Sequence, residues 1–187
     1  WEKEFSVKGL AILAETAWAG NEKGVALAKA MQNFATVVSD PEATLPHTIT
    51  PDLSKVEGFT ASASKDEGTN FVVTGKGLVM GNAVGIRIYG TSETDITDAL
   101  TVKVNGKDVT DKAVINAGAN AGEYTIDLYV NAKNMSSELN IVITEGTKTC
   151  LSLKDRVDAI AASYGSENVL AQQLLVYIQA AVAYAKA

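Results

Sequence analysis

The sequence predicts an α+β protein in which an antiparallel β-sandwich is inserted between two helical hairpins that pack as a bundle. Three observations lead to this fold class. Amphipathic runs of helical period open the chain between Ser6 and Val38 and close it between Ser152 and Tyr184. Between them, from about Val56 to Thr147, apolar and polar residues alternate. The first pattern is typical of helices that bury one side, and the second is typical of half-buried strands.

Residues 1–39 are predicted to form the N-terminal helical hairpin. Two amphipathic runs are separated there by a turn at Trp18–Asn21, and the second run carries Leu27, Met31 and Phe34 at helical spacing. The closing segment repeats this spacing with Leu170, Leu174 and Tyr177. Neither pair of helices can bury its apolar stripe alone, so we expect the two pairs to pack together or onto the middle segment.

Residues 40–55 are predicted to be a linker. All three prolines of the chain, Pro41, Pro46 and Pro51, lie in this segment. Each proline removes a backbone donor and disfavours helix in the residue before it. The opening helices are therefore expected to end before Pro41.

Residues 56–149 are predicted to form the β-sandwich. In the clearest strand, Glu123–Asn131, alternation places Tyr124, Ile126, Leu128 and Val130 on one face. The strand Leu100–Val104 ends in Asn105–Gly106, the dipeptide best suited to a tight hairpin turn. Further strands are predicted at Phe59–Ser64, Asn70–Thr74, Val84–Tyr89, Ala113–Asn116 and Leu139–Thr144. About seven short antiparallel strands imply a sandwich.

Residues 150–187 are predicted to form the C-terminal helical hairpin. Ser152, with Asp155 three residues later, resembles a capping box, and Ser166 is expected to cap the last helix. That helix, Glu167–Ala187, is apolar on most of its circumference. A helix of this kind must be covered on more than one side, and the opening hairpin is the natural cover.

Composition excludes several classes of function. The 16 basic and 22 acidic residues give a net charge of −6, and no basic run is present, so a nucleic-acid partner is not expected. The apolar run Val169–Ala183 is shorter than the roughly 20 residues that cross a bilayer, so this segment is not expected to insert into a membrane. The single cysteine, Cys150, excludes an internal disulfide and is expected to be a small buried residue. Few cysteines suit both a cytosolic protein and a secreted protein of an anaerobe. Because the chain begins at Trp1, we expect it to be a piece of a longer protein.

No motif in the sequence indicates an enzyme, a cofactor site or a metal site. The single histidine, His47, has no second histidine or metal-binding motif near it. Gly75–Gly81 resembles a phosphate-binding loop but lacks its Gly-Lys-Ser/Thr order, and strand-end glycines explain it better. The acidic segment Ser92–Asp98 could hold calcium, although its spacing differs from that of an EF-hand and an acidic turn exposed to solvent explains it as well.

Four residues form the candidate ligand-binding site. If Ile86 and Ile88 point into the core, alternation turns Arg87 and Tyr89 outward, and the same rule turns Asp127 and Tyr129 outward on a second strand. Exposed tyrosine rings can cover the apolar C–H surface of sugars while polar neighbours, here Arg87 and Asp127, orient hydroxyl groups. The stronger explanation is a structural one, in which the tyrosines are a cross-strand pair or lie under the helices. Trp18 is expected to be buried between helices, with exposure as the alternative.

Several segments together resemble modules of large secreted and cell-surface proteins of gut Clostridia. These segments are Asp52–Ser54, Gly85–Tyr89, Leu100–Lys107, Glu123–Thr125, Ser152–Lys154 with Leu170, Ala171, Tyr177, Ala180, Ala181 and Tyr184, and the opening Phe5–Lys8 with Val25–Phe34. The resemblance implies an immunoglobulin-like domain that follows one helical pair and precedes another. It also implies an extracellular or cell-surface setting beside carbohydrate-active or adhesive domains. The chain departs from the pattern at Ile178–Gln179, where the modules have smaller or more polar residues.

We therefore expect a non-catalytic, extracellular structural or adhesion module of a bacterial surface protein, with other surface proteins or glycans as partners. The alternative is a carbohydrate-binding module that recognises a polysaccharide through its exposed aromatic residues.

Overall fold

The computed structural model describes residues 7–80 and 83–187 and has an α+β fold, with four α-helices and two antiparallel sheets in these residues. The chain divides into two compact units. The first, here called the helical unit, comprises the chain up to Gly58 together with Ala161–Ala187. The second, the sheet unit, comprises Phe59–Ile160. The boundary falls within α3 (Val157–Ser163).

The helical unit is built on α1 (Val7–Ala17), α2 (Glu22–Ser39) and α4 (Val169–Ala185). Asparagines cap two of these helices. The side-chain oxygen of Asn21 accepts a hydrogen bond from Gly24 N at the start of α2, and that of Asn168 accepts one from Ala171 N at the start of α4, each at 2.9 Å. The prediction that Ser166 caps the last helix is therefore wrong, because the helix begins later than expected and Asn168 occupies the capping position.

Aromatic stacking joins the opening helices to the closing helix. α2 packs against both α1 and α4. The rings of Phe34 and Tyr177 stack at 5.9 Å, and those of Trp18 and Tyr184 stack at 5.2 Å. Trp18 is half-buried, and its side chain lies so close to α2 that a β-carbon at Gly24 would approach it to 2.9 Å. The stack of Trp18 on Tyr184 holds the turn between α1 and α2 against the last turn of α4.

Buried amides attach the linker to the helices. Asn33 on α2 has no exposed surface, and its side-chain amide donates to His47 O at 2.8 Å and to Gln173 Oε1 on α4 at 3.1 Å. Its Oδ1 accepts from His47 N at 3.0 Å. Further along the linker, Asp52 exchanges two hydrogen bonds with the Gln179 amide, at 2.8 and 2.9 Å. Linker and helices therefore form one hydrogen-bonded structure.

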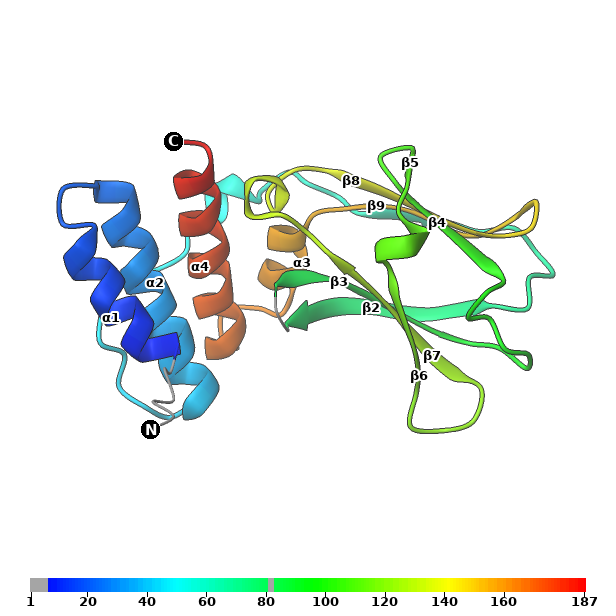
Figure 1. Cartoon of the computed structure of the whole chain (residues 1–187), viewed down its shortest axis with the longest axis horizontal. Coiled ribbons are helices and arrows are strands. Elements are labelled where there is room, and N and C mark those ends of the chain that lie inside the picture. Colours follow the sequence, from blue (N-terminus) through cyan, green and yellow to red (C-terminus); the bar gives the residue numbers. More distant parts are fainter. Residues whose placement is uncertain (1–6, 81–82) are drawn as a thin grey trace. The chain divides into compact units, whose positions relative to one another are not determined.

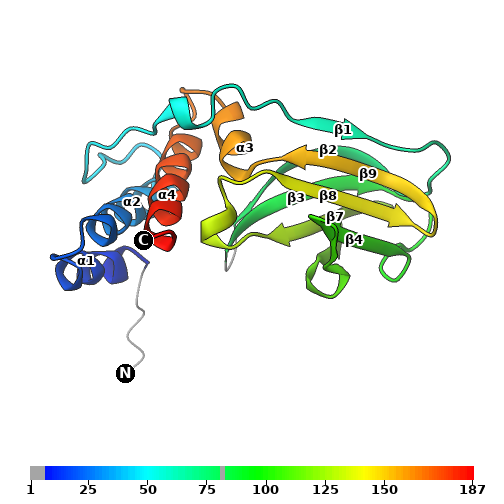
Figure 2. The same ribbon diagram turned by 90° about the horizontal axis from the view of Figure 1, so that it is seen from above.

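The sheet unit contains nine strands in its described residues, each ladder antiparallel. One sheet has the order β1-β9-β8-β4-β5 and the other β2-β3-β7-β6, and Figures 1 and 2 show the two stacked as layers. The strands are β1 (Ser62–Ser64), β2 (Val72–Met80), β3 (Val84–Thr91), β4 (Leu100–Val104), β5 (Lys107–Asp108), β6 (Val114–Ala117), β7 (Glu123–Tyr129), β8 (Leu139–Glu145) and β9 (Lys148–Asp155). Three short 3-10 turns accompany the strands and linker: η1 (Leu53–Lys55), η2 (Thr110–Lys112) and η3 (Ala132–Asn134).

The core of the sheet unit is aliphatic and follows the alternation of the sequence. Its main inward side chains, all at most 5% exposed, are Ile86, Ile88, Val102, Ile126, Leu128, Ile141, Ile143 and Leu153. The predicted Asn105–Gly106 turn is confirmed: both residues have positive φ, 51° and 76°, and they join β4 to β5.

Two further boundaries predicted from the sequence are wrong. Residues 150–155 do not open a helical hairpin, because they pair with β8 as the strand β9, and helix starts only at Val157. The strand predicted to end at Thr74 continues through the glycine-containing run to Met80, with a register shift between Val73 and Gly75. In both places pairing with a neighbouring strand outweighs the local signal.

Strand β2, at the edge of its sheet, carries a lysine on its inward side. Lys76 lies opposite Ile88, whose side chain is fully buried, and its ammonium group bonds the carboxylate of Asp155 on β9 in the other sheet. Asp155 is 1% exposed, and it also accepts a hydrogen bond from Arg156 N at 2.8 Å. The ion pair therefore links the two sheets beside the aliphatic core.

No helix within the described ranges combines the length and the apolar character needed to cross a membrane.

The core assignment can be tested by replacing neighbouring residues of β7. Ile126→Ala should lower the free energy of unfolding by about 2–5 kcal/mol, because Ile126 is fully buried and its truncation leaves a cavity. Thr125→Ala, on the opposite face, should cost under about 0.5 kcal/mol. Urea denaturation measures both, and equal midpoints would show that the wrong face has been assigned to the core.

The amide network can be tested with adjacent glutamines of α4. Gln173 is 4% exposed and accepts from Asn33, whereas the neighbouring Gln172 is half-buried and donates to Gly165 O at the surface. Gln173→Ala should cost about 1–3 kcal/mol, because it leaves a buried donor unsatisfied, while Gln172→Ala should cost under about 1 kcal/mol. Thermal unfolding of the two variants gives the comparison. A Gln172→Ala variant that melts as early as Gln173→Ala would argue against the network.

Candidate functional site

The four predicted site residues lie on one face of two neighbouring strands. β3 and β7 pair directly, with Arg87 opposite Asp127, Tyr89 opposite Thr125 and Gly85 opposite Tyr129. Residues that face each other in this register share a side of the sheet, and this side is opposite to the one that carries Ile86 and Ile126. The structure therefore brings together the side chains whose adjacency the sequence could only suggest. We call this surface the tyrosine face.

Arg87 and Asp127 form a bidentate ion pair at the centre of the tyrosine face. Arg87 Nε donates to Asp127 Oδ1 at 2.6 Å, and the Nη2 group donates to Oδ2 at 2.7 Å. Hydrogen bonding to Asp127, with a smaller contribution from Tyr89, raises the pKa of Arg87 above its usual range, although burial acts in the opposite direction. Arg87 remains positively charged at any pH at which the protein is folded.

Asp127 is on the predicted face but is not open to solvent. Only 3% of its surface is exposed, and both carboxylate oxygens are bound to Arg87. Asp127 lies on the predicted face, but the expectation that its carboxylate is open to ligand hydroxyl groups is wrong, because the Arg87 guanidinium covers it. Its role in this structure is to hold Arg87 in place.

Tyr89 and Tyr129 are the exposed aromatic side chains of the tyrosine face, at 40% and 43% exposure. They lie four residue positions apart along the strands and on adjacent strands. At about 3.3 Å per residue and about 4.8 Å between strands, their backbones are roughly 14 Å apart. The neighbouring strand β2 places Gly75 opposite Tyr89 and Gly77 opposite Arg87, so no side chains flank the face there. Val79 opposite Gly85 and Val114 opposite Asp127 lie on the same side of the sheet, so the face carries two exposed rings, one cation and two apolar neighbours.

Gly85 allows β3 and β7 to approach each other below Tyr129. A β-carbon at this position would collide with the backbone carbonyl of Leu128. A side chain here would therefore disturb the pairing that positions Tyr129.

The lone histidine belongs to the polar network of the helical unit. His47 Nε2 lies 2.9 Å from Gln32 Oε1, and the Gln32 amide donates to Glu15 Oε2 at 2.8 Å. In residues 7–80 and 83–187 no three histidine, cysteine or acidic side chains converge in a way that could hold a metal ion. His47 therefore helps to attach the linker, and its contacts explain its position.

The acidic segment forms a turn that uses its own carboxylate. Asp95 Oδ1 accepts from Thr97 N at 2.9 Å and from Thr97 Oγ1 at 2.7 Å, and these bonds hold the pKa of Asp95 below its ordinary value. The turn is thus stabilised internally.

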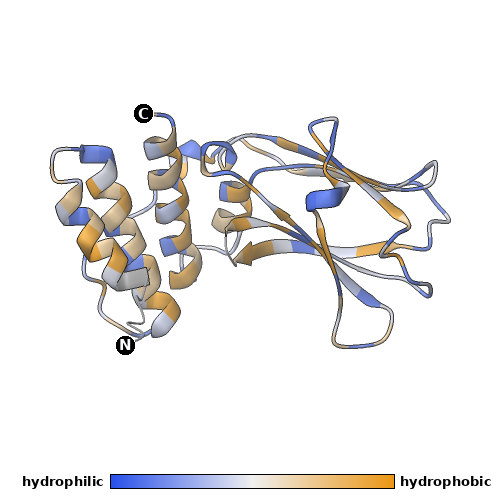
Figure 3. Cartoon of the chain, in the orientation of Figure 1, coloured by the Kyte–Doolittle hydropathy of each residue, from blue (hydrophilic) through white to orange (hydrophobic). Residues whose placement is uncertain are grey.

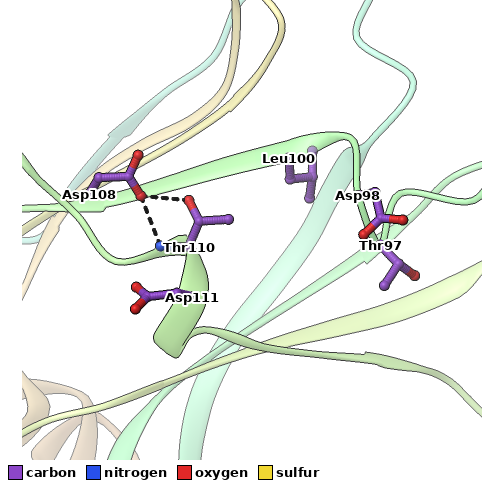
Figure 4. A pocket seen from close by; sticks show the side chains of 6 residues that line it. All are labelled: Thr97, Asp98, Leu100, Asp108, Thr110 and Asp111. Carbon is purple, nitrogen blue, oxygen red and sulfur yellow. Dashed lines mark hydrogen bonds between the residues drawn. The ribbon is translucent and has the colours of Figure 1, made fainter.

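A shallow, acid-lined hollow of about 640 Å³ lies between this turn and η2 (Figure 4). Its lining includes Asp98, Asp108 and Asp111. Asp108 points to Thr110, accepting from its N at 3.0 Å and its Oγ1 at 2.8 Å, and these bonds lower the pKa of Asp108. The Asp108 carboxylate therefore accepts hydrogen bonds within its own turn, as the Asp95 carboxylate does.

Cys150 is buried, as expected. It is 1% exposed, and burial raises the pKa of its thiol. Cys150 lies in β9 at the register shift, between Thr149 and Leu151, which both pair with β8. Its buried side chain acts there as a packing residue.

Comparisons with protein families, with curated proteins and with solved structures find no match to this chain. The geometry of the tyrosine face is therefore the basis for any functional assignment.

The ion pair can be tested by a pair of substitutions. Arg87→Met should cost about 3 kcal/mol, because it leaves the buried Asp127 carboxylate without its partner. Arg87→Met with Asp127→Leu should recover most of that loss, because no unpaired charge remains. Urea denaturation of the wild type and both variants measures this recovery. A double variant no more stable than the single one would show that Asp127 is not dependent on Arg87.

Proposed function

We propose that this chain is a non-catalytic structural or adhesion module of an extracellular bacterial surface protein, and that the tyrosine face is its contact surface. In this proposal the sheet unit is an immunoglobulin-like sandwich, and α1, α2 and α4 of the helical unit form the bundle. The function is recognition and display, with another surface macromolecule as the partner.

Strand order supports the immunoglobulin-like assignment. The constant-type immunoglobulin sandwich has the sheets A-B-E-D and G-F-C. The order β2-β3-β7-β6 corresponds to the first and β9-β8-β4 to the second, with β5 as an added strand next to β4. β1 is a further strand at the edge beside β9. On this correspondence, the tyrosine face is the outer side of the sheet formed by strands A, B, E and D.

The observation that carries the proposed contact surface is the arrangement of Arg87 between two exposed tyrosines. Tyrosine and arginine are the residue types that, with tryptophan, contribute most to binding energy at protein interfaces. Because Asp127 fixes the guanidinium, little side-chain entropy remains to be lost when Arg87 contacts a partner. The two rings lie roughly 14 Å apart, and this span fits a macromolecule better than a small solute, which binds in concave sites.

The carbohydrate-binding alternative rests on the same two rings. Tyr89 and Tyr129 are exposed on one side of the sheet and roughly 14 Å apart, so an extended polysaccharide could contact both. Sugar hydroxyl groups also require acceptors, and the Asp127 carboxylate is already bound. We therefore favour a protein partner and keep the glycan as the second candidate.

The proposal can be tested with beads coated with the whole chain. We expect the beads to adhere to bacterial cells, and we expect protease treatment of the cells to abolish adhesion while periodate, which oxidises sugars, leaves it intact. The reverse result, or retention on insoluble polysaccharide, would favour the carbohydrate-binding module. Beads that adhere to neither cells nor polysaccharide would contradict both functions of this face.

Tyr129→Ala should weaken whichever interaction is found by about tenfold or more, because an exposed aromatic side chain within a contact carries much of its affinity. Tyr164→Ala is the matched control, since Tyr164 is an exposed tyrosine of the helical unit. Titration calorimetry or bead retention measures the difference. Equal losses in the two variants would show that the tyrosine face is not the contact surface.

A further inference from the structure

A hollow of about 490 Å³ opens beside the end of β7, past Val114, the first residue of β6. β6 pairs with β7 only between Tyr124 and Asp127, so the end of β7 has no strand neighbour on that side. The β4–β5 hairpin and the end of η2 form the opposite wall. The lining residues come from four separate segments of the chain, at 86, 104–112, 128–134 and 139–141, so no single sequence motif predicts the hollow.

Apolar side chains of both sheets form the floor. Ile86 and Leu128 come from one sheet, and Leu139 and Ile141 from the other, each at most 5% exposed. Val104 and Val109, both half-buried, continue this surface toward the opening. The size and the apolar floor are those of sites for small organic ligands, which usually fill 300–1,000 Å³ or so.

The rim is polar and positively charged in a protein that is acidic as a whole. Its polar side chains are Asn105, Lys107, Lys112, Tyr129, Asn131 and Asn134. Among the described residues that line the hollow there are two lysines and no carboxylate, although the chain carries a net charge of −6. Neither ammonium group bonds a carboxylate within residues 7–80 and 83–187. The charged side chains that line this hollow therefore favour an anion, whereas their sequence neighbours Asp108 and Asp111 line the other hollow.

We propose that this hollow binds a small organic acid with an aromatic or alicyclic body of up to three rings. The apolar body of the ligand lies on the aliphatic floor, its anionic group contacts Lys107 and Lys112, and the rim asparagines bond its remaining polar atoms. This activity goes beyond the contact function of the tyrosine face. Tyr129 belongs both to the tyrosine face and to the hollow. The test therefore uses Lys107 and Lys112, which line the hollow and are not part of the tyrosine face.

The test uses a matched pair of fluorescent probes and the whole chain. The first is 1-anilinonaphthalene-8-sulfonate, whose aromatic body carries a sulfonate. The second is N-phenyl-1-naphthylamine, the same body without the anion. We expect the sulfonate probe to bind at least tenfold more tightly than the neutral probe. Equal affinities would overturn the proposal, because they would show that the lysines contribute nothing, and so would the absence of any fluorescence change with the sulfonate probe.

Charge-matched variants locate the binding. Lys107→Met with Lys112→Met should weaken the sulfonate probe at least tenfold and change the neutral probe less than twofold. Lys23→Met with Lys65→Met makes the same charge change at exposed positions elsewhere and should leave both affinities unchanged. Equal weakening in the two double variants would indicate a general charge effect and would contradict the site.

Backbone NMR of the labelled protein provides the second readout. On addition of the sulfonate probe, the largest amide shifts should fall in residues 105–112 and 128–134. Shifts centred on α1 would overturn the proposal, because Leu10, Ile12 and Leu13 are exposed on that helix and form an alternative apolar surface, visible in the colouring of α1 in Figure 3. Tyr89→Ala should leave probe binding intact while weakening adhesion, so this inference and the proposed function can fail separately.

Discussion

The antiparallel pairing of β3 with β7 is the contact on which most of the sheet unit depends. Its register sets Ile86 against Leu128 and Ile88 against Ile126 on the inward side, and Arg87 against Asp127 on the outward side. A shift of one residue would turn the side chains of one strand to the other side of the sheet, so that Asp127 would lie beside the inward isoleucines and Leu128 beside Arg87. Because burial of the isoleucines favours only one register, the same free energy that forms the core also positions the tyrosine face.

A polar network has the corresponding role in the helical unit. α4 is apolar on most sides, and apolar contacts alone would allow it several rotations against α2. The amides of Asn33 and Gln173 are both buried and bond each other, so a rotation of either helix would leave buried polar groups unsatisfied. His47 joins the same network through its backbone. The linker is therefore held against α2 as part of the helical unit.

Sequence patterns predicted the elements better than their boundaries. Asn105–Gly106 and the alternation in β7 carry strong local signals, and both led to the correct structure. Ser152–Asp155 also carries a local signal, that of a helix cap, but these residues continue the alternation of β9 and pair with β8. Whether these residues form a helix cap or a strand depends on pairing with β8, which lies outside the segment that carries the local signal.

The candidate site shows the same limit. Alternation correctly assigned Arg87, Tyr89, Asp127 and Tyr129 to one side of their strands, yet the exposure of Asp127 depends on the cross-strand position of Arg87, which sequence alone does not fix. The hollow beside β7 was not predicted for a related reason. It exists because β6 is shorter than its neighbour, and its lining comes from parts of the chain that have no common pattern.

The inward lysine of β2 has a consequence for assembly. Another chain could extend the sheet at this edge only by adding its strand along β2, where the register shift at Val73 and Gly75 interrupts the regular row of backbone donors and acceptors. Such a strand would also enclose the Lys76 ammonium group, which is now partly hydrated, without offering it a second carboxylate. Inward charges and bulges of this kind discourage edge-to-edge association in natural sheets. The β2 edge therefore discourages a second copy of this chain from extending the sheet by strand pairing.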